Sequence, residues 1–229
     1  MNRTLSVIKL HRRDRFSWFF IPLLILGSSF VVNLLISWLI SDTENMYTGG
    51  ISSVLVYIFV LGIIVVAQTF PFAISFSISR FNYFAGTIVM ALIISFGSAL
   101  LLLLMSIIEN QLTNHWWSGL YFFYLPYLSD GNLLVQLLTL FLIALHLFLW
   151  GFALGSFYRK FKKTGMLILF LASGVVLTLS SYIITQNHGW LDIWAWLTKH
   201  TALGLSLWLL PFILLNALLS FLLLRRSTI

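Results

Sequence analysis

Cysteine is absent from this chain of 229 residues, and charged residues make up only 8% of it. The lack of cysteine excludes disulfides, a thiol nucleophile and cysteine-ligated metal sites. The lack of charge, beside a hydrophobic content of 60% and a mean hydropathy of +1.01, excludes a soluble domain, because so few charges cannot cover that much apolar surface. Long unbroken apolar runs also argue against a membrane β-barrel, whose strands alternate in polarity. The composition therefore predicts one all-α, polytopic membrane domain over residues 1–229.

Sequence motifs for nucleotide binding and hydrolysis are missing as well. The chain contains no G-x-x-x-x-G-K-[ST] phosphate loop, no G-x-S-x-G or H-E-x-x-H motif and no paired carboxylates. We therefore expect no catalytic residues, no metal site and no cofactor bound by this chain. On this basis the chain is not expected to be an enzyme.

Six apolar runs are present, each near the ~20 residues that a helix needs to cross the hydrocarbon core. Helix is expected for each run, because backbone polar groups in lipid must find partners within their own segment. The predicted spans are residues 16–40, 51–72, 85–108, 133–157, 165–184 and 202–224. A basic head, residues 1–15, precedes them and is expected to fix the topology, or also to lie as an amphipathic helix on anionic lipid.

The basic residues predict the orientation of these spans. With both termini in the cytosol, the inner side holds the head, Arg80, the cluster Arg159–Lys163 and the tail pair Arg225 and Arg226. Only Lys199 is then left outside, whereas the outer acidic residues are Asp42, Glu44, Glu109, Asp130 and Asp192. The expected protein is a multi-pass protein of a plasma membrane, bacterial in type, with N-in/C-in topology. The net charge of +7 reflects this topology, so no nucleic-acid partner is expected.

Residues 186–201, between the fifth and sixth predicted spans, form an apolar segment too short to cross a membrane. The segment carries Trp190, Trp194 and Trp196. These residues are typical of the aromatic belt at the headgroup level. Alternatively, the segment forms a short helix that dips into the outer leaflet.

Polar residues inside predicted spans are the default functional candidates in a membrane protein. His146 is the one ionisable residue deep in a span, and Gln136 and Gln68 are further polar positions. A lone histidine either contributes to a pathway or makes a hydrogen bond between helices. The absence of deep Asp, Glu, Lys or Arg counts against a coupled secondary transporter. Gly151 and Gly155 form a G-x-x-x-G pattern, which favours close helix packing.

The stretch Ala73–Gly86 separates the second and third runs and contains a single charge. Its alternation of apolar residues with serine does not decide between a helix and a turn. From Ile78 it reads Ile-Ser-Arg-Phe-Asn-Tyr-Phe-Ala-Gly. This phrase resembles the first cytoplasmic loop of ABC exporter permeases of the second type. The basic head, the six runs and the apolar excursion before the last run are similar too.

The resemblance implies a half-transporter. Two six-helix permeases, identical or sister subunits, would associate with two cytosolic ATP-binding subunits that hold ATP and magnesium. In that family the loop docks on the ATPase as a coupling helix. By resemblance, the residues that couple to the ATPase are Ser79, Arg80, Phe81, Tyr83 and Phe84, with Phe76 beside them. Arg80 would contact the ATPase or brace the loop, and the aromatic residues would fill a cleft or anchor the loop on the bilayer. One departure is Phe81-Asn82, where relatives commonly carry further charge.

These observations predict the membrane subunit of an ATP-binding cassette exporter that moves an amphipathic, peptide or lipid-like substrate. Two alternatives stay open. The first is a stand-alone secondary transporter, whose transport would follow a proton gradient and depend on His146. The second is a non-transporting membrane accessory subunit.

Overall fold

The computed structural model describes residues 3–40, 45–129 and 131–225. Four residues of the predicted charge sorting, Asp42, Glu44, Asp130 and Arg226, lie outside these ranges. The helices are α1 (Arg3–Arg13), η1 (Phe16–Phe20), α2 (Ile21–Ile40), α3 (Ser52–Ser75), α4 (Arg80–Ile107), η2 (Ile108–Leu112), η3 (His115–Trp117), α5 (Leu133–Gln186), α6 (Trp190–Lys199), α7 (Ala202–Leu207) and α8 (Leu209–Arg225). Two short strands, β1 (Met46–Tyr47) and β2 (Leu120–Tyr121), pair in parallel. The prediction of an all-α chain is confirmed for the described residues except for these two short strands.

Among the described residues, five helical stretches are long and apolar enough to cross a membrane. They are Phe16–Ile40, Ser52–Ser75, Arg80–Leu112, Leu133–Gln186 and Ala202–Arg225. These stretches are compatible with the predicted multi-pass membrane protein. The predicted fourth and fifth spans both fall within the single element α5.

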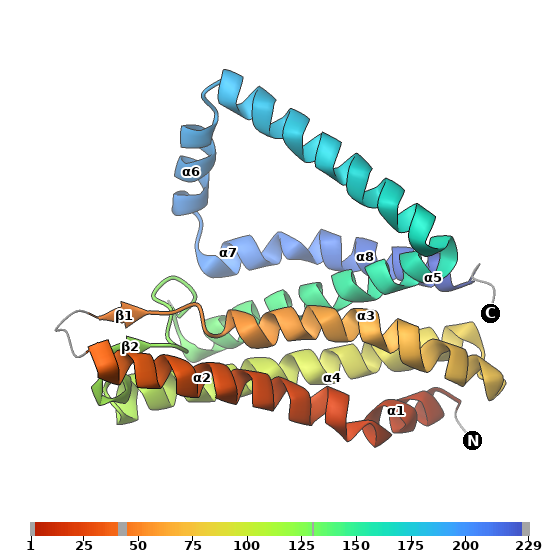
Figure 1. The fold of residues 1–229 in the computed structure, drawn as a ribbon, viewed down its shortest axis with the longest axis horizontal. Helices are drawn as coiled ribbons and strands as arrows, with labels where there is room; N and C mark the ends of the chain where they lie inside the picture. Colours follow the sequence, from red (N-terminus) through yellow and green to blue (C-terminus); the bar gives the residue numbers. More distant parts are fainter. Residues whose placement is uncertain (1–2, 41–44, 130, 226–229) are drawn as a thin grey trace.

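Helix α5 has 54 residues, so a straight α5 would be about 80 Å long, far more than a bilayer core of about 30 Å. It is broken at Lys162, whose φ of 56° and ψ of −157° are not helical. Figure 1 shows the ribbon of α5 turning back on itself. We call residues 133–161 the first arm and residues 163–186 the second arm.

The centre of the bundle is the contact between α3 and the first arm of α5 (Figure 1). Glycines allow the two backbones to touch. A Cβ on Gly151 would overlap the carbonyl oxygen of Phe59, and one on Gly62 would overlap that of Phe148. The predicted G-x-x-x-G pattern thus packs on α3 of the same chain, since a Cβ on Gly155 would also crowd α3. Helices α4 and α8 then pack against α5.

The second arm and α6 stand apart from this bundle (Figure 1). Every residue from 171 to 183 is exposed, and so is every residue of α6. Helix α6 lies in the segment 186–201, where a short helix is one of two expectations. The structure therefore leaves an apolar helical hairpin largely without protein contacts.

The bundle has two chemically different ends. The basic end is formed by α1, the α3–α4 turn, the break in α5 and the last turn of α8, so the described part of the chain begins and ends there (Figure 1). Its described basic residues are Arg3, Lys9, Arg12, Arg13, Arg15, Arg80, Arg159, Lys160, Lys162, Lys163 and Arg225. The opposite end, which we call the loop end, carries β1 and the segment that follows η2. We call the described part of that segment, residues 113–129, the aromatic segment; it includes η3 and β2. The described basic residues of the bundle therefore gather at one end, as the sequence predicts.

The glycine contact generates a stability prediction. Replacing Gly151 by valine should lower the melting temperature in detergent by at least about 3 °C, because overpacking costs about 1–3 kcal/mol. Tryptophan fluorescence during heating measures this change. The control is Gly174→Val, since Gly174 has no atom within 4 Å of an added Cβ. Equal melting temperatures for the two variants would contradict the close α3–α5 packing.

Candidate functional site at the basic end

The connection between α3 and α4 is a tight turn of residues 76–79. Ser77 takes a left-handed conformation with φ of 58°, and the N–H of Ile78 donates to the carbonyl of Ala73 at 3.2 Å. Ser79 then caps α4, because its hydroxyl accepts the N–H of Asn82 at 3.2 Å. Helix α3 extends to Ser75 and α4 begins at Arg80. The sequence Ile78–Gly86, which carries the resemblance to exporter permeases, therefore lies mostly in the first turns of α4.

Arg80 and two of the predicted aromatic residues face α8. The Arg80 guanidinium donates a hydrogen bond to the backbone carbonyl of Arg225, at the last residue of α8. A cation at this position also complements the negative end of the helix dipole. The ring of Phe221 lies 5.2 Å from that of Phe84 and 6.2 Å from that of Phe81. Arg80 therefore braces α4 against α8.

Tyr83 faces the opposite direction and is completely buried. Its hydroxyl donates to the carbonyl of Val65 in α3 at 3.0 Å and lies 2.9 Å from the hydroxyl of Thr69. Its ring meets the ring of Phe70 edge-on at 5.1 Å. Tyr83 thus ties α4 to α3 beneath the turn and lies away from the outer surface, whereas Phe81 is 63% exposed.

Gly86 and Thr87 receive the basic head, which forms α1. Val7 is fully buried, and a Cβ on Gly86 would lie 2.7 Å from the Cβ of Val7. His11 is fully buried too, with Nε2 at 3.1 Å from the Thr87 hydroxyl and its ring 5.0 Å from Trp18. The glycine of the phrase is therefore the position where α1 packs on α4.

An open groove of about 650 Å³ lies between α1 and the α3–α4 turn. Lys9 and Arg13 line it from α1, and the apolar side chains of Phe72 in α3 and of Phe76 and Ile78 in the turn line the other side. None of its lining residues is acidic. Phe76 is 64% exposed, so an aromatic face and two cations are available to a partner. We call this the head groove.

Two of the predicted polar pathway residues lie on different helices. Gln68 is exposed on α3. His146 is partly buried in the first arm of α5, where its ring faces those of Trp150 and Phe212 at 6.2 and 6.4 Å. Its Nδ1 is buried and has no hydrogen-bond partner among the described residues.

Gln136 lies near the start of α5 and holds the preceding loop. Its amide donates to the carbonyls of Ser129 and Gly131 at 2.6 and 3.1 Å. Ten residues separate it from His146, which is about 15 Å along a helix. The structure does not bring Gln136, His146 and Gln68 together into one polar site.

Sequence reasoning missed a buried carboxylate at the loop end. Glu109 is fully buried, and its oxygens accept the indole N–H of Trp116 at 2.8 Å. They also accept the backbone N–H groups of Phe122, Phe123 and Tyr124 at 2.8 to 3.1 Å. One side chain thus organises the whole aromatic segment. No sequence signal could have found it, because three of its donors are backbone groups.

Comparison of the chain with protein-family models, with curated proteins and with solved structures finds no match.

Burial of His11 makes the packing of α1 dependent on pH. Desolvation lowers the pKa of His11 to about 4, although the carboxylate of Asp14 opposes this by favouring the charged form. The imidazole of an unfolded chain has a pKa near 6.5, so protonation below that pH favours the unpacked state. The stability present above pH 6.5 is lost progressively down to about pH 4, by about 3 kcal/mol in all.

Because the chain has no cysteine, the distance between α1 and α4 can be measured with spin labels on the Leu5→Cys and Phe81→Cys positions. We expect a narrow distance distribution at pH 7.5 and a broad one at pH 4.5. In a His11→Gln background, which removes the titrating group, the narrow distribution should persist at both pH values. Broadening in both backgrounds would show that another group controls the packing.

The buried Glu109 carboxylate generates a prediction for the loop end. A Glu109→Gln change replaces an acceptor oxygen by a donor, leaving buried N–H groups unpaired at about 1–3 kcal/mol each. Chymotrypsin should then cleave the aromatic segment at least about tenfold faster in detergent. Asp192→Asn, on the exposed helix α6, is the matched control. Unchanged cleavage of the Glu109 variant would show that the carboxylate does not hold the segment.

Proposed function

We propose that this chain is the membrane subunit of an ATP-binding cassette exporter in a bacterial plasma membrane, with its basic end in the cytosol. One observation carries the proposal. The α3–α4 turn projects an exposed aromatic residue beside two cations and is braced at once to α1, α3 and α8. In this proposal the two arms of α5 are separate spans, giving six spans with both termini inside.

The bracing suits a turn that transmits force. Arg80 ties it to α8, Tyr83 to α3 and Gly86 to α1. A push on residues 76–79 would therefore move three helices as a unit, because packed interiors are stiff. Within this proposal Phe76 and Phe81 contact the ATPase, whereas Ser79, Arg80, Tyr83 and Phe84 hold the turn in shape.

The head groove fits a partner segment that is both acidic and apolar. Lys9 and Arg13 supply the charge, and Phe76 supplies an aromatic contact of the kind that dominates interface energies. The chain has no phosphate loop of its own, so ATP and magnesium belong on that partner. The proposed partner is a cytosolic ATP-binding subunit.

The exposed hairpin supports a second permease in the complex. The second arm of α5 and helix α6 bury almost none of their apolar surface within this chain. A sister or identical permease packed there, with lipid covering the remainder, completes the proposed exporter. The substrate then passes between the two subunits. The apolar and aromatic character of the spans favours an amphipathic, peptide or lipid-like substrate.

The test is purification of the tagged chain from host membranes, followed by labelling of co-purifying chains with 8-azido-ATP. We expect one ATP-binding chain in stoichiometric amount. A Lys9→Glu, Arg13→Glu, Phe76→Ala variant should weaken the association at least about tenfold, because an interface anchor is worth about 2 kcal/mol. Arg12→Glu is the matched control, since Arg12 is exposed on α1 but does not line the head groove.

Other outcomes identify the alternatives. A chain that purifies without an ATP-binding partner, and whose transport in vesicles follows a proton gradient and is lost in His146→Ala, is a secondary transporter. A chain with neither property is an accessory subunit. Either outcome would overturn the exporter proposal.

A further inference from the structure

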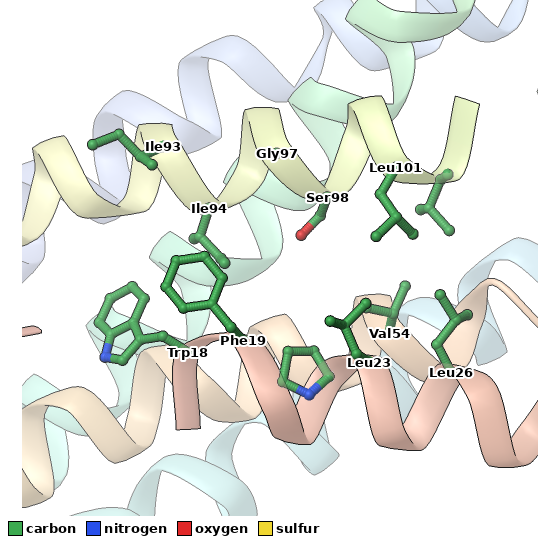
Figure 2. A pocket seen from close by; sticks show the side chains of 12 residues that line it. Trp18, Phe19, Leu23, Leu26, Val54, Ile93, Ile94, Gly97, Ser98 and Leu101 are labelled. Carbon is green, nitrogen blue, oxygen red and sulfur yellow. The ribbon is translucent and has the colours of Figure 1, made fainter. Parts of the chain in front are cut away.

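A second groove, the α2–α4 groove, lies between two apolar helices that face each other without packing closely (Figure 2). Its volume is about 220 Å³. Phe19 and Leu23 line one wall, Ile93 and Gly97 line the other, and Val54 of α3 closes the base. It shares no lining residue with the head groove.

The α2–α4 groove is closed at its base and open at its rim. Val54 at the base and Leu102 on the α4 wall are at most 4% exposed. At the rim, Phe19, Leu23 and Ile93 are 42 to 50% exposed. A ligand therefore enters sideways between the helices, from the medium that surrounds them.

Chemistry restricts the occupant of the groove to hydrocarbon. No lining residue is charged, and the only hydroxyl belongs to Ser98, which points into the groove in Figure 2. A charged or strongly polar group would lose its hydration there without compensation. Ile93 lies thirteen residues beyond Arg80, or about 20 Å along α4, which is within the ~30 Å hydrocarbon layer when the basic end is at its surface.

Size favours a single chain over a helix. A protein helix is about 10–12 Å across with its side chains and does not fit a groove of 220 Å³. An apolar cavity of about 150 Å³ already takes up benzene, so this volume accommodates a longer alkyl segment. Gly97 deepens the groove, because no atom lies within 4 Å of the position its Cβ would occupy.

We propose that the α2–α4 groove binds one acyl chain of a phospholipid from the surrounding bilayer. The site does not depend on the exporter function. It would be occupied equally in a transporter of another class, because it requires only that α2 and α4 cross the membrane side by side.

The test uses the full chain in nanodiscs made from phosphatidylglycerol that carries a photoactivatable diazirine in one acyl chain. Irradiation should label residues 19–23 and 93–98 above the level of the exposed second arm of α5. Gly97→Leu, which fills the groove, should reduce that labelling at least about fivefold, as a blocked site predicts. Gly27→Leu is the matched control, because Gly27 also has open space at its Cβ but does not line the groove.

Three results would overturn the site. One is labelling of the groove residues that is unchanged in Gly97→Leu, and another is labelling no stronger there than on the second arm. The third is a protein–protein crosslink between copies from Leu23→Cys or Ile93→Cys, which would make the groove a helix contact. Gly97→Ala, a smaller change, should reduce labelling by an intermediate amount while size-exclusion profiles stay unchanged.

Discussion

The rest of the structure depends on the contact of α3 with the first arm of α5. In lipid the hydrophobic effect does not drive helices together, so their association depends on van der Waals contact between closely approaching backbones. Gly62 and Gly151 provide that approach, and neither position tolerates a Cβ. With these two helices joined, α4 and α8 have a common surface to cover. The basic end is then assembled at one end of that surface.

At the basic end, residues of the sequence Ile78–Gly86 join four helices, α1, α3, α4 and α8. Arg80 bonds to the end of α8, Tyr83 to the backbone of α3, and Gly86 admits α1. Each residue faces a different neighbour because successive positions point around the helix. The exposed part of the junction consists of the turn, the head groove and Phe81 at the start of α4. This division separates residues that support the turn from those that can meet a partner.

The long helices and one packing motif could be predicted from the sequence. Apolar runs in lipid must be helical, so the long helices follow from hydropathy, whereas α1 and α6 do not. The pattern at Gly151 and Gly155 predicts close packing but not its partner in α3. Lys162 carries no mark of a chain reversal, and the capping of α4 by Ser79 shortens an expected loop to a turn. Glu109 binds backbone groups, which every residue has, so its role depends on tertiary structure.

The packing of α1 on α4 also sets an order of events during synthesis. Val7 and Gly86 are far apart in the chain, so the head helix has no docking surface until α4 has been made. Until then its cations are free to interact with the membrane surface and to bias the orientation of α2. Afterwards the same helix becomes one wall of the head groove. The basic head thus serves twice, first during insertion of the chain and later as part of the folded protein.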